Sequence, residues 1–504
     1  MAIPVIDLFA GPGGLGEGFS SVFDENGHRV FKNVLSVEME KFAHQTLTLR
    51  SFYRQFSPDE VPDEYYELLR NNLTEEELYQ LYPEESQAAK NESKNWKLGY
   101  DNDSVSNTEL DQTIVERLNG ENEWILTGGP PCQAYSVVGR SRLQRKTLDG
   151  RKDERVNLYK HYLRIIKKHR PSVFIMENVK GMLSARSKTH SVFKRIMMDL
   201  KSPGYRVFSL VRPPRNDLFE GSEYEPEDFV IRAEEFGIPQ ARHRVILVGI
   251  REDFYRQPPD LLSKIGPVPI SEIISDLPRI RSSLSKSIDT WENWKAVLDS
   301  FLINGALTHI DTKVRLEIET AISKLRKPKK GSGDNFVKKT LNQKNLAFEA
   351  NWFIDKRIGG FCNHHSRGHM DSDLLRYLFV SSFGKIHKKS PKLEDFPEQL
   401  LPAHRNVQDG IKKKKFADRF RVQLYDSPAK TITSHISKDG HYYIHPDPTQ
   451  CRSLTVREAA RIQTFPDNYY FCGPRTAQYI QVGNAVPPLL ANRIAKITAD
   501  LFNL

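Results

Sequence analysis

Hydrophobic and polar positions alternate in two distinct patterns over the first 250 residues. Short, continuous apolar runs predict strands that are buried on both faces. Between them, positions such as Leu158, Tyr162 and Ile165 fall on one face of a predicted helix. Apolar strands that alternate with amphipathic helices predict an α/β sheet with helices on both faces. The predicted strands cover residues 3–9, 34–38, 124–127, 172–176 and 245–250.

The pattern changes twice along the chain and divides it into regions. Residues 51–122 are charged and rich in Glu, Tyr and Asn, and they predict a helical insertion in a first domain, 1–251. Residues 252–450 carry Pro-rich and basic stretches with interspersed aromatic residues, which is typical of a separate domain with long loops. Strong helix patterns return in 451–504, which we expect to rejoin the first domain.

Length and composition narrow the class of protein. A chain of 504 residues exceeds one ordinary core, and 38% hydrophobic residues suit globular domains. The sequence has no apolar run long enough to span a bilayer and no basic stretch before its apolar N-terminus. We therefore expect a cytoplasmic protein without a membrane partner.

The net charge bears on the kind of partner, and the cysteine content bears on disulfides and zinc fingers. The formal net charge of +10 and a pI of about 9.1 favour a polyanionic partner such as nucleic acid, although many basic proteins bind none. The four cysteines show no CxxC pairing, which argues against a disulfide framework or a zinc finger. They are Cys132, Cys362, Cys451 and Cys472.

A glycine-rich segment, 7–19, follows the first predicted strand. Glycines at that place allow a tight turn and a close approach of the backbone to a cofactor, although a dinucleotide site or a plain turn has the same pattern. Glu38 ends the next strand, where a carboxylate can bind ribose hydroxyls or simply be solvated. This edge of the sheet is a candidate cofactor site.

Cys132 lies in the segment Gly-Gly-Pro-Pro-Cys-Gln, directly after another predicted strand. The prolines fix φ and place the thiol on a stiff loop at the carboxyl edge of the sheet, where open α/β sheets bind ligands. A thiolate there would be a nucleophile. The alternative, a small buried hydrophobic residue, explains the two prolines less well.

Two further motifs carry candidate catalytic groups. Glu177 ends a predicted strand and could carry a proton, or could cap the following turn. Arg242 and Arg244 begin the strand 245–250, and in an extended segment both would point to one side. Two guanidiniums there could hold an anion or a base carbonyl, although arginines at a strand start are often just solvated.

Taken in this order, the four motifs resemble those of the C5-cytosine DNA methyltransferase family of restriction–modification type. Three more segments resemble that family: Asp153, Arg155 and Leu158 its fifth motif, 452–467 its ninth and 481–488 its tenth. The resemblance covers both ends of the chain, whereas the middle and the insertion match only loosely. It implies an S-adenosylmethionine-dependent, Rossmann-like mixed sheet with helices on both faces and a smaller, irregular target-recognition domain.

The activity implied by the resemblance is methyl transfer from S-adenosylmethionine to carbon 5 of a cytosine flipped out of duplex DNA. Cys132 would attack carbon 6, Glu177 would protonate or hydrogen-bond ring N3, and Arg244, with Arg242 beside it, would contact the base carbonyl. The cofactor residues implied are Phe9, Gly11, Gly14, Glu38, Met39, Pro131, Leu158, Asn484 and Ala485. One family feature, an acid after the third strand that holds the adenine amino group, is not assignable from the sequence.

Partners and rivals follow from the same resemblance. We expect double-stranded DNA, a cognate restriction endonuclease encoded nearby, a monomer, and no metal. The segment 362–369, Cys-Asn-His-His-Ser-Arg-Gly-His, could hold zinc but is crowded, so a polar hinge or DNA-facing element is favoured. The alternative functions are those of an RNA cytosine methyltransferase of the same fold, a catalytically silent DNA-binding relative, and a nicotinamide- or flavin-dependent oxidoreductase.

Overall fold

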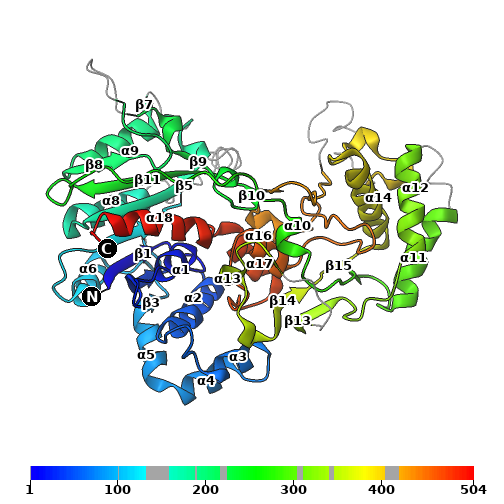
Figure 1. Cartoon of the computed structure of the whole chain (residues 1–504), viewed down its shortest axis with the longest axis horizontal. Helices are drawn as coiled ribbons and strands as arrows, with labels where there is room; N and C mark the ends of the chain where they lie inside the picture. Colours follow the sequence, from blue (N-terminus) through cyan, green and yellow to red (C-terminus); the bar gives the residue numbers. More distant parts are fainter. Residues whose placement is uncertain are drawn as a thin grey trace.

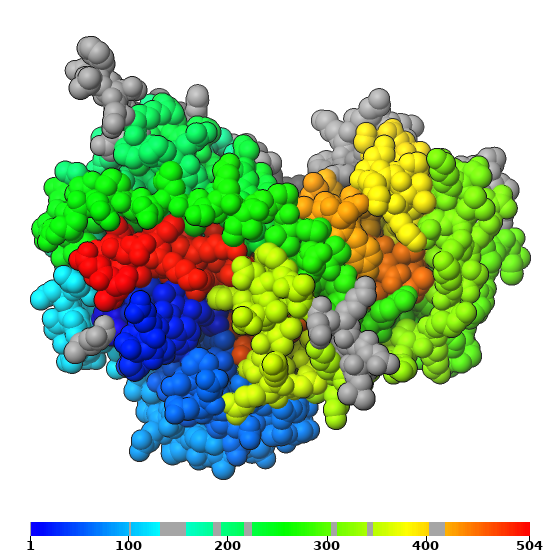
Figure 2. All heavy atoms as spheres, in the orientation of Figure 1, coloured from blue at the N-terminus to red at the C-terminus, as the bar shows by residue number. Residues whose placement is uncertain are grey.

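A computed structural model describes residues 2–99, 102–131, 158–184, 186–187, 190–215, 224–303, 310–339, 346–402 and 419–504. The chain forms an α/β lobe, a central block and an outer helical lobe (Figure 1). Figure 2 shows the surface hollowed between the α/β lobe and the outer lobe on this view. Within the described part of the chain, no helix is long and apolar enough to cross a membrane.

The α/β lobe is built on an eight-stranded mixed sheet, in which β9 pairs with β11 beside the order β3-β2-β1-β4-β5-β11-β8. Strands β1 to β5 run parallel, and β11 runs antiparallel to β5, β8 and β9. The expected mixed α/β sheet is confirmed. Its strands are β1 (Ile3–Leu8), β2 (Phe31–Val37), β3 (Ser93–Lys94), β4 (Ile125–Gly128), β5 (Val173–Val179), β8 (Tyr205–Phe208), β9 (Val230–Arg232) and β11 (His243–Arg251).

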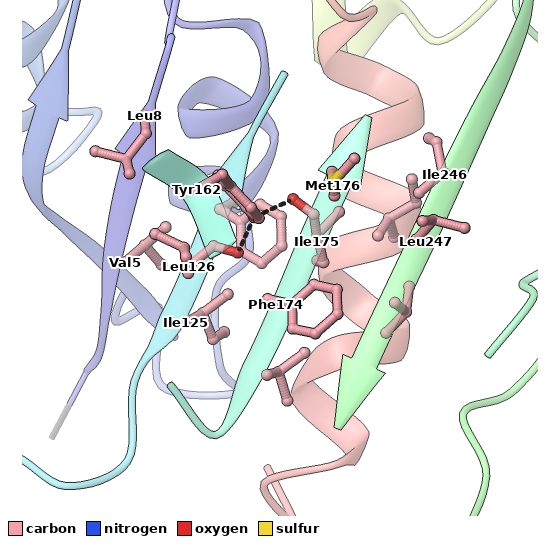
Figure 3. Close-up of a cluster of buried hydrophobic side chains, with 14 of the residues drawn as sticks. Val5, Leu8, Ile125, Leu126, Tyr162, Phe174, Ile175, Met176, Ile246 and Leu247 are labelled. Carbon is pink, nitrogen blue, oxygen red and sulfur yellow. Dashed lines mark hydrogen bonds between the residues drawn. The ribbon is translucent and has the colours of Figure 1, made fainter. Parts of the chain in front are cut away.

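Central strands of the sheet are buried along almost their whole length, as their unbroken apolar sequence predicts. Side chains of β1, β4, β5 and β11 form one core with helices α8 (Leu158–His169) and α18 (Pro488–Asp500). Tyr162 of α8 donates its hydroxyl to the carbonyl oxygens of Leu126 and Ile175, at 3.1 and 2.9 Å (Figure 3). These two hydrogen bonds hold α8 against the adjacent strands β4 and β5.

Helix α18 joins the end of the chain to its beginning. It packs against α1 (Gly14–Ser20) so closely that a Cβ on Gly18 would lie 2.5 Å from the backbone nitrogen of Asn492. The side chain of Asn492 also donates to the carbonyl oxygens of Gly18 and Ser21, at 3.3 and 3.1 Å. The sheet lobe is therefore completed by the last helix of the chain (Figure 1).

The expected insertion, 51–122, differs from the structure at both ends. Helix α2 (Lys41–Arg54) extends into it, and β3 pairs in parallel with β2, so β3 belongs to the main sheet. The added part is a helical cluster with a core of buried aromatic residues. Its helices are α3 (Asp63–Leu69), α4 (Glu75–Leu81) and α5 (Pro83–Glu92); α6 (Asn107–Leu118) leads into β4.

The central block gathers segments from three parts of the chain around one core. Arg461 ties them together through ion pairs with Asp467 at 2.6 Å and Asp276 at 3.1 Å, all buried. Its elements are β10 (Gln240–Ala241), α10 (Ser271–Ile274), β13 (Gly333–Lys338), α13 (Ala350–Phe353), β14 (Gly360–His365), β16 (Ala429–Lys430), α16 (Val456–Ile462) and α17 (Arg475–Asn484).

The outer lobe has a separate core. Its main elements are α11 (Trp291–Ile303), α12 (Thr312–Ser323) and α14 (Asp371–His387), with the short strands β12 (Ser283–Leu284) and β15 (Gly368–His369). The predicted boundary at 450 does not separate these cores, because 454–485 packs in the central block and only α18 returns to the sheet. Residues scattered over 268–443 share that central core, which no local composition change marks.

Candidate active site

The carboxyl ends of β1, β2, β4 and β5 surround a cavity of about 370 Å³. Parallel strands bring these ends to one edge, where open α/β sheets bind ligands. Eight of the nine predicted cofactor residues line this cavity: Phe9, Gly11, Glu38, Met39, Pro131, Leu158, Asn484 and Ala485. Residues from both ends of the chain thus share one site.

Gly14 is the one predicted cofactor residue that does not line the cavity. It begins α1, and a Cβ at this position would overlap the carbonyl oxygen of Val486. Val486 itself lines the cavity. Gly14 therefore allows the C-terminal segment to approach, whereas Phe9 and Gly11, with φ of 59° each, make the turn that faces the cavity.

Glu38 is held in place by backbone donors. Its carboxylate accepts the N–H groups of Gly11 at 2.9 Å and Glu40 at 2.7 Å. Burial raises the pKa of Glu38, and those backbone N–H groups act in the opposite direction. A carboxylate fixed at the rim of an otherwise largely apolar cavity suits the recognition of hydroxyl groups.

Glu177 and Arg244 form an ion pair beside this cavity. Arg244 Nε lies 2.9 Å from Glu177 Oε1, and the two side chains are 16% and 13% exposed. The antiparallel register of β5 and β11 places them together, since Arg244 pairs with Val179 and Ile246 with Glu177. Glu177 lines the cavity wall, close to Gly129 of the segment that leads to Pro131.

Arg242 has different hydrogen-bond partners from Arg244. The residue falls between β10 and β11, where its amide nitrogen donates to the carbonyl of Gln240 in a turn of the backbone. Its buried side chain donates to three backbone carbonyls: Ile432 at 2.8 Å, Gly483 at 3.4 Å and Ala485 at 2.8 Å. Arg242 is a positioning residue that anchors the C-terminal wall of the cavity, which corrects its expected contact with a substrate.

The third strand supplies cavity residues that sequence reasoning missed. β3 has only two residues, too few for a periodic signal, and the following Trp96 and Leu98 line the cavity. Asn95 donates to the carbonyls of Glu38 and Met39, at 2.9 and 3.1 Å, and so ties this segment to the end of β2. Between β3 and β4, no carboxylate of the described residues 95–99 and 102–124 lines the cavity; the wall there is apolar.

Three predicted residues, Cys132, Asp153 and Arg155, lie outside the described residues. Pro131, which precedes Cys132, does line the cavity. The segment 362–369 lies in the interior: Cys362 donates to the Leu69 carbonyl, and His364 contacts Thr455 at 3.0 Å and the Pro278 carbonyl at 2.8 Å. These contacts connect the central block to its neighbours.

The known proteins to which the chain is similar are described as methylases or methyltransferases. A family model described as C-5 cytosine-specific DNA methylase matches residues 84–499. Type II methyltransferase M.Bpa9945I of Bacillus paralicheniformis is 35% identical over 516 residues, 99% of each chain. Type II methyltransferase M1.HphI of Haemophilus parahaemolyticus is 26% identical over 98% of this chain and 86% of its own. The Entamoeba histolytica methyltransferase EhMeth covers 100% of this chain and 98% of its own at 13% identity and a TM-score of 0.45.

Proposed function

The chain belongs to the C-5 cytosine-specific DNA methylase family, and from this we propose how its cavity and the Glu177–Arg244 pair act in methyl transfer. It is a DNA cytosine-5 methyltransferase, and the resemblance found in its sequence motifs is confirmed. Membership of a methyltransferase family implies use of S-adenosylmethionine. When bound, S-adenosylmethionine supplies an electrophilic methyl group.

The cavity at the sheet edge fits this cofactor in chemistry and in size. Glu38 offers a fixed carboxylate to ribose hydroxyls. Phe9, Trp96 and Leu158 offer apolar surface for an adenine ring. Asn484 and Ala485 close the cavity from the C-terminal side, held there by Arg242.

The ion pair between Glu177 and Arg244 is the observation that carries the catalytic proposal. Glu177 at the cavity wall and Arg244, which pairs with it, can bind two different edges of one cytosine ring. In its protonated form Glu177 donates a proton or hydrogen bond to N3, and Arg244 donates to the base carbonyl, which stabilises the charge that develops during attack. Each group also holds the other in position before the base enters.

Cys132 is the proposed nucleophile. Its thiolate adds to carbon 6, and the electron pair of the 5,6 double bond then makes carbon 5 nucleophilic. Carbon 5 would then take the methyl group that S-adenosylmethionine supplies, which leaves S-adenosylhomocysteine. A solvent base would accept the carbon 5 proton, and the carbon 6–sulfur bond would break to release the thiolate. The target base reaches this site only when it is flipped out of the duplex.

The outer lobe is the proposed target-recognition region. It faces the α/β lobe across the hollow in Figure 2, and basic side chains there would neutralise phosphates and give salt-dependent binding. We expect one chain to act as a monomer on double-stranded DNA in the bacterial cytoplasm.

The biological role follows from the relatives, which are named type II methyltransferases. We propose that the enzyme protects host DNA in a type II restriction–modification system, with a cognate endonuclease encoded nearby. Inactivation of the methyltransferase gene in the native host should then lead to cleavage of the chromosome. Survival with intact DNA, in a host without a neighbouring endonuclease gene, would refute the pairing.

Covalent trapping tests the chemistry directly. Duplex DNA libraries that contain 5-fluorocytosine should form a stable adduct with the wild-type enzyme and S-adenosylmethionine, because fluorine cannot leave as the proton does. Cys132→Ser should abolish the adduct, and Glu177→Gln should slow its formation roughly 100-fold or more. Glu234→Gln is the matched control, since Glu234 pairs with His243 at 2.7 Å and lies outside the cavity lining.

Each trapping outcome has a definite meaning. An adduct that persists in Cys132→Ser would refute the nucleophile, and equal slowing in Glu177→Gln and Glu234→Gln would refute the proposed role of Glu177. Failure to form any adduct on libraries that cover all short target sequences would refute the reaction scheme.

A further inference from the structure

A second cavity of about 510 Å³ lies between α1, the C-terminal half of α2 and residues 351–357. It shares no lining residue with the cofactor cavity. Helix α2 touches both: Ala43 lines the cofactor cavity, and Arg54, roughly 16 Å further along the helix axis, lines the second. The volume of the second cavity is in the range of sites that bind small molecules.

Arginine side chains dominate the inner wall of this second cavity. One of them, Arg50, is fully satisfied: it binds both carboxylate oxygens of Glu17, at 2.8 and 2.5 Å, and donates to Asn468 at 3.1 Å. Its guanidinium also stacks 3.8 Å above the ring of Tyr53. Glu17 is thereby already engaged by one arginine.

Arg54 is not satisfied. Its side chain is only 5% exposed, and Nη2 donates to Glu92 at 2.6 Å. Nε and Nη1 have no hydrogen-bond acceptor among the described residues; the nearest carboxylate oxygen that Nη1 faces is Glu17 Oε2, 3.8 Å away. Buried donors of a charged group without acceptors cost free energy that an acceptor in the cavity would recover.

Arg29 lacks a charged partner. It donates to the backbone carbonyls of Ser20 and Phe56, and it has no ion pair with any carboxylate in the described part of the chain. Burial lowers the pKa of Arg29; the negative charge of Glu17 acts in the opposite direction, and the positive charges of Arg54 and Arg50 lower the pKa further. Three guanidiniums therefore lie near Glu17, and Glu92 pairs with one of them, Arg54.

The remaining charges lie around these arginines. Lys356 and Arg357 add two positive charges, of which Arg357 pairs with Asp63 at 2.7 Å, and Asp59 and Asp355 add two carboxylates. Asp355 accepts hydrogen bonds from Tyr66 at 2.6 Å and Asn468 at 2.8 Å, so its oxygens are already engaged. Together the lining residues carry five cationic side chains and three carboxylates.

We propose that this arginine-lined cavity binds a small anion through phosphate or carboxylate oxygens, with Arg29 and Arg54 as its principal donors. Guanidinium groups suit such oxygens because their planar N–H groups match them in pairs. Trp352 lines the same cavity and leaves apolar surface for the rest of the ligand. This site is separate from methyl transfer and does not depend on the roles proposed for Glu177 and Arg244.

Anion binding to the full-length enzyme tests the proposal. Melting temperature and isothermal titration should show saturable stabilisation by inorganic phosphate, and separately by citrate, relative to chloride at equal ionic strength. Saturating S-adenosylhomocysteine and a short DNA duplex are included, so that the cofactor cavity and the DNA surface are occupied. A response to phosphate alone, or to citrate alone, identifies which oxygen chemistry the site prefers.

Variants locate the binding site. Arg29→Gln should weaken anion binding roughly tenfold or more, because one charged donor is lost. Lys356→Gln, an exposed side chain at the cavity lining, should weaken it by about two- to fivefold without touching the interior. Arg315→Gln on α12 removes an equal charge from an exposed ion pair far along the chain and should change nothing.

The proposal is overturned if neither anion stabilises the wild-type enzyme beyond chloride. It is equally overturned if Lys356→Gln and Arg315→Gln bind phosphate and citrate as the wild type does while Arg29→Gln fails only by unfolding. Methyltransferase activity, measured in parallel, should stay unchanged in Lys356→Gln.

Discussion

Asp7, at the end of β1, gives the fold a specific dependence on pH. Its side chain is fully buried; Oδ1 accepts a hydrogen bond from Thr127 at 3.0 Å, and Oδ2 has no partner among the described residues. Burial raises the pKa of Asp7 to about 7, although the hydrogen bond from Thr127 lowers it. At pH 5 to 6 the folded protein therefore holds a proton that the unfolded chain has lost.

The sign and size of the effect follow from linkage. A carboxyl group whose folded pKa is raised binds more protons in the folded state, so stability falls as pH rises from about 4 to about 7 and is level above that. This window spans roughly three pH units, and at about 1.4 kcal/mol per unit the loss reaches roughly 4 kcal/mol. That is a large share of the stability of an ordinary domain.

Asp7→Asn removes this titration while keeping the shape of the side chain. The free energy of unfolding, from urea titrations followed by tryptophan fluorescence under reducing conditions, is compared for the variant and the wild type at pH 5 and pH 8. The variant should gain on the wild type by roughly 3 kcal/mol between the two pH values, because about two pH units of the window lie above pH 5.

Asp24→Asn is a control, because the stability that Asp24 contributes changes with pH in the opposite direction. Asp24 is exposed, and its pKa is lowered chiefly by the backbone N–H of His28, so stability from this group is lost as pH falls and the variant should not gain at pH 8. If the difference between the wild type and Asp7→Asn is the same at pH 5 and pH 8, Asp7 titrates normally and the reasoning about its burial is wrong.

Three further predictions concern the closure of the cavity. Gly18→Ala should lower the melting temperature, at a cost of about 1–3 kcal/mol, because its Cβ would press on Ala491 of α18; an unchanged melting temperature would contradict this packing. Arg242→Lys should weaken binding of S-adenosylmethionine at least roughly tenfold in calorimetry, because one ammonium group cannot donate to all three backbone carbonyls that Arg242 contacts. Retained affinity would show that the anchor is dispensable. Trp96→Ala should raise the KM for S-adenosylmethionine with a smaller effect on kcat, because it removes cavity wall away from the reacting atoms, and a pure loss of kcat would refute that assignment.

Much of the sheet and of the site was predictable from local sequence. Unbroken apolar runs marked β1, β4, β5 and β11, and glycine, proline and acidic residues at strand ends marked the cavity. Glu177 and Arg244 were both expected at the site, and the register of β5 and β11 explains why they meet. Their catalytic roles stay predictions.

Other features depend on contacts that no local pattern carries. Arg242 has the same chemistry as Arg244, and only the turn between β10 and β11 gives it a different partner. β3 is too short for a periodic signal, so Trp96 was missed. Gly14 was expected at the cofactor, but its neighbour is Val486, which is more than 470 positions away in the sequence.

The placement of 484–486 in the cavity wall also sets a time order during synthesis. A ribosome makes the turn after β1 long before the opposite wall, so a nascent chain has no complete cofactor cavity until residues 484–486 have been translated. Helix α18, which packs on α1, is synthesised later still. A chain that terminates before residue 484 therefore lacks one wall of the cofactor cavity.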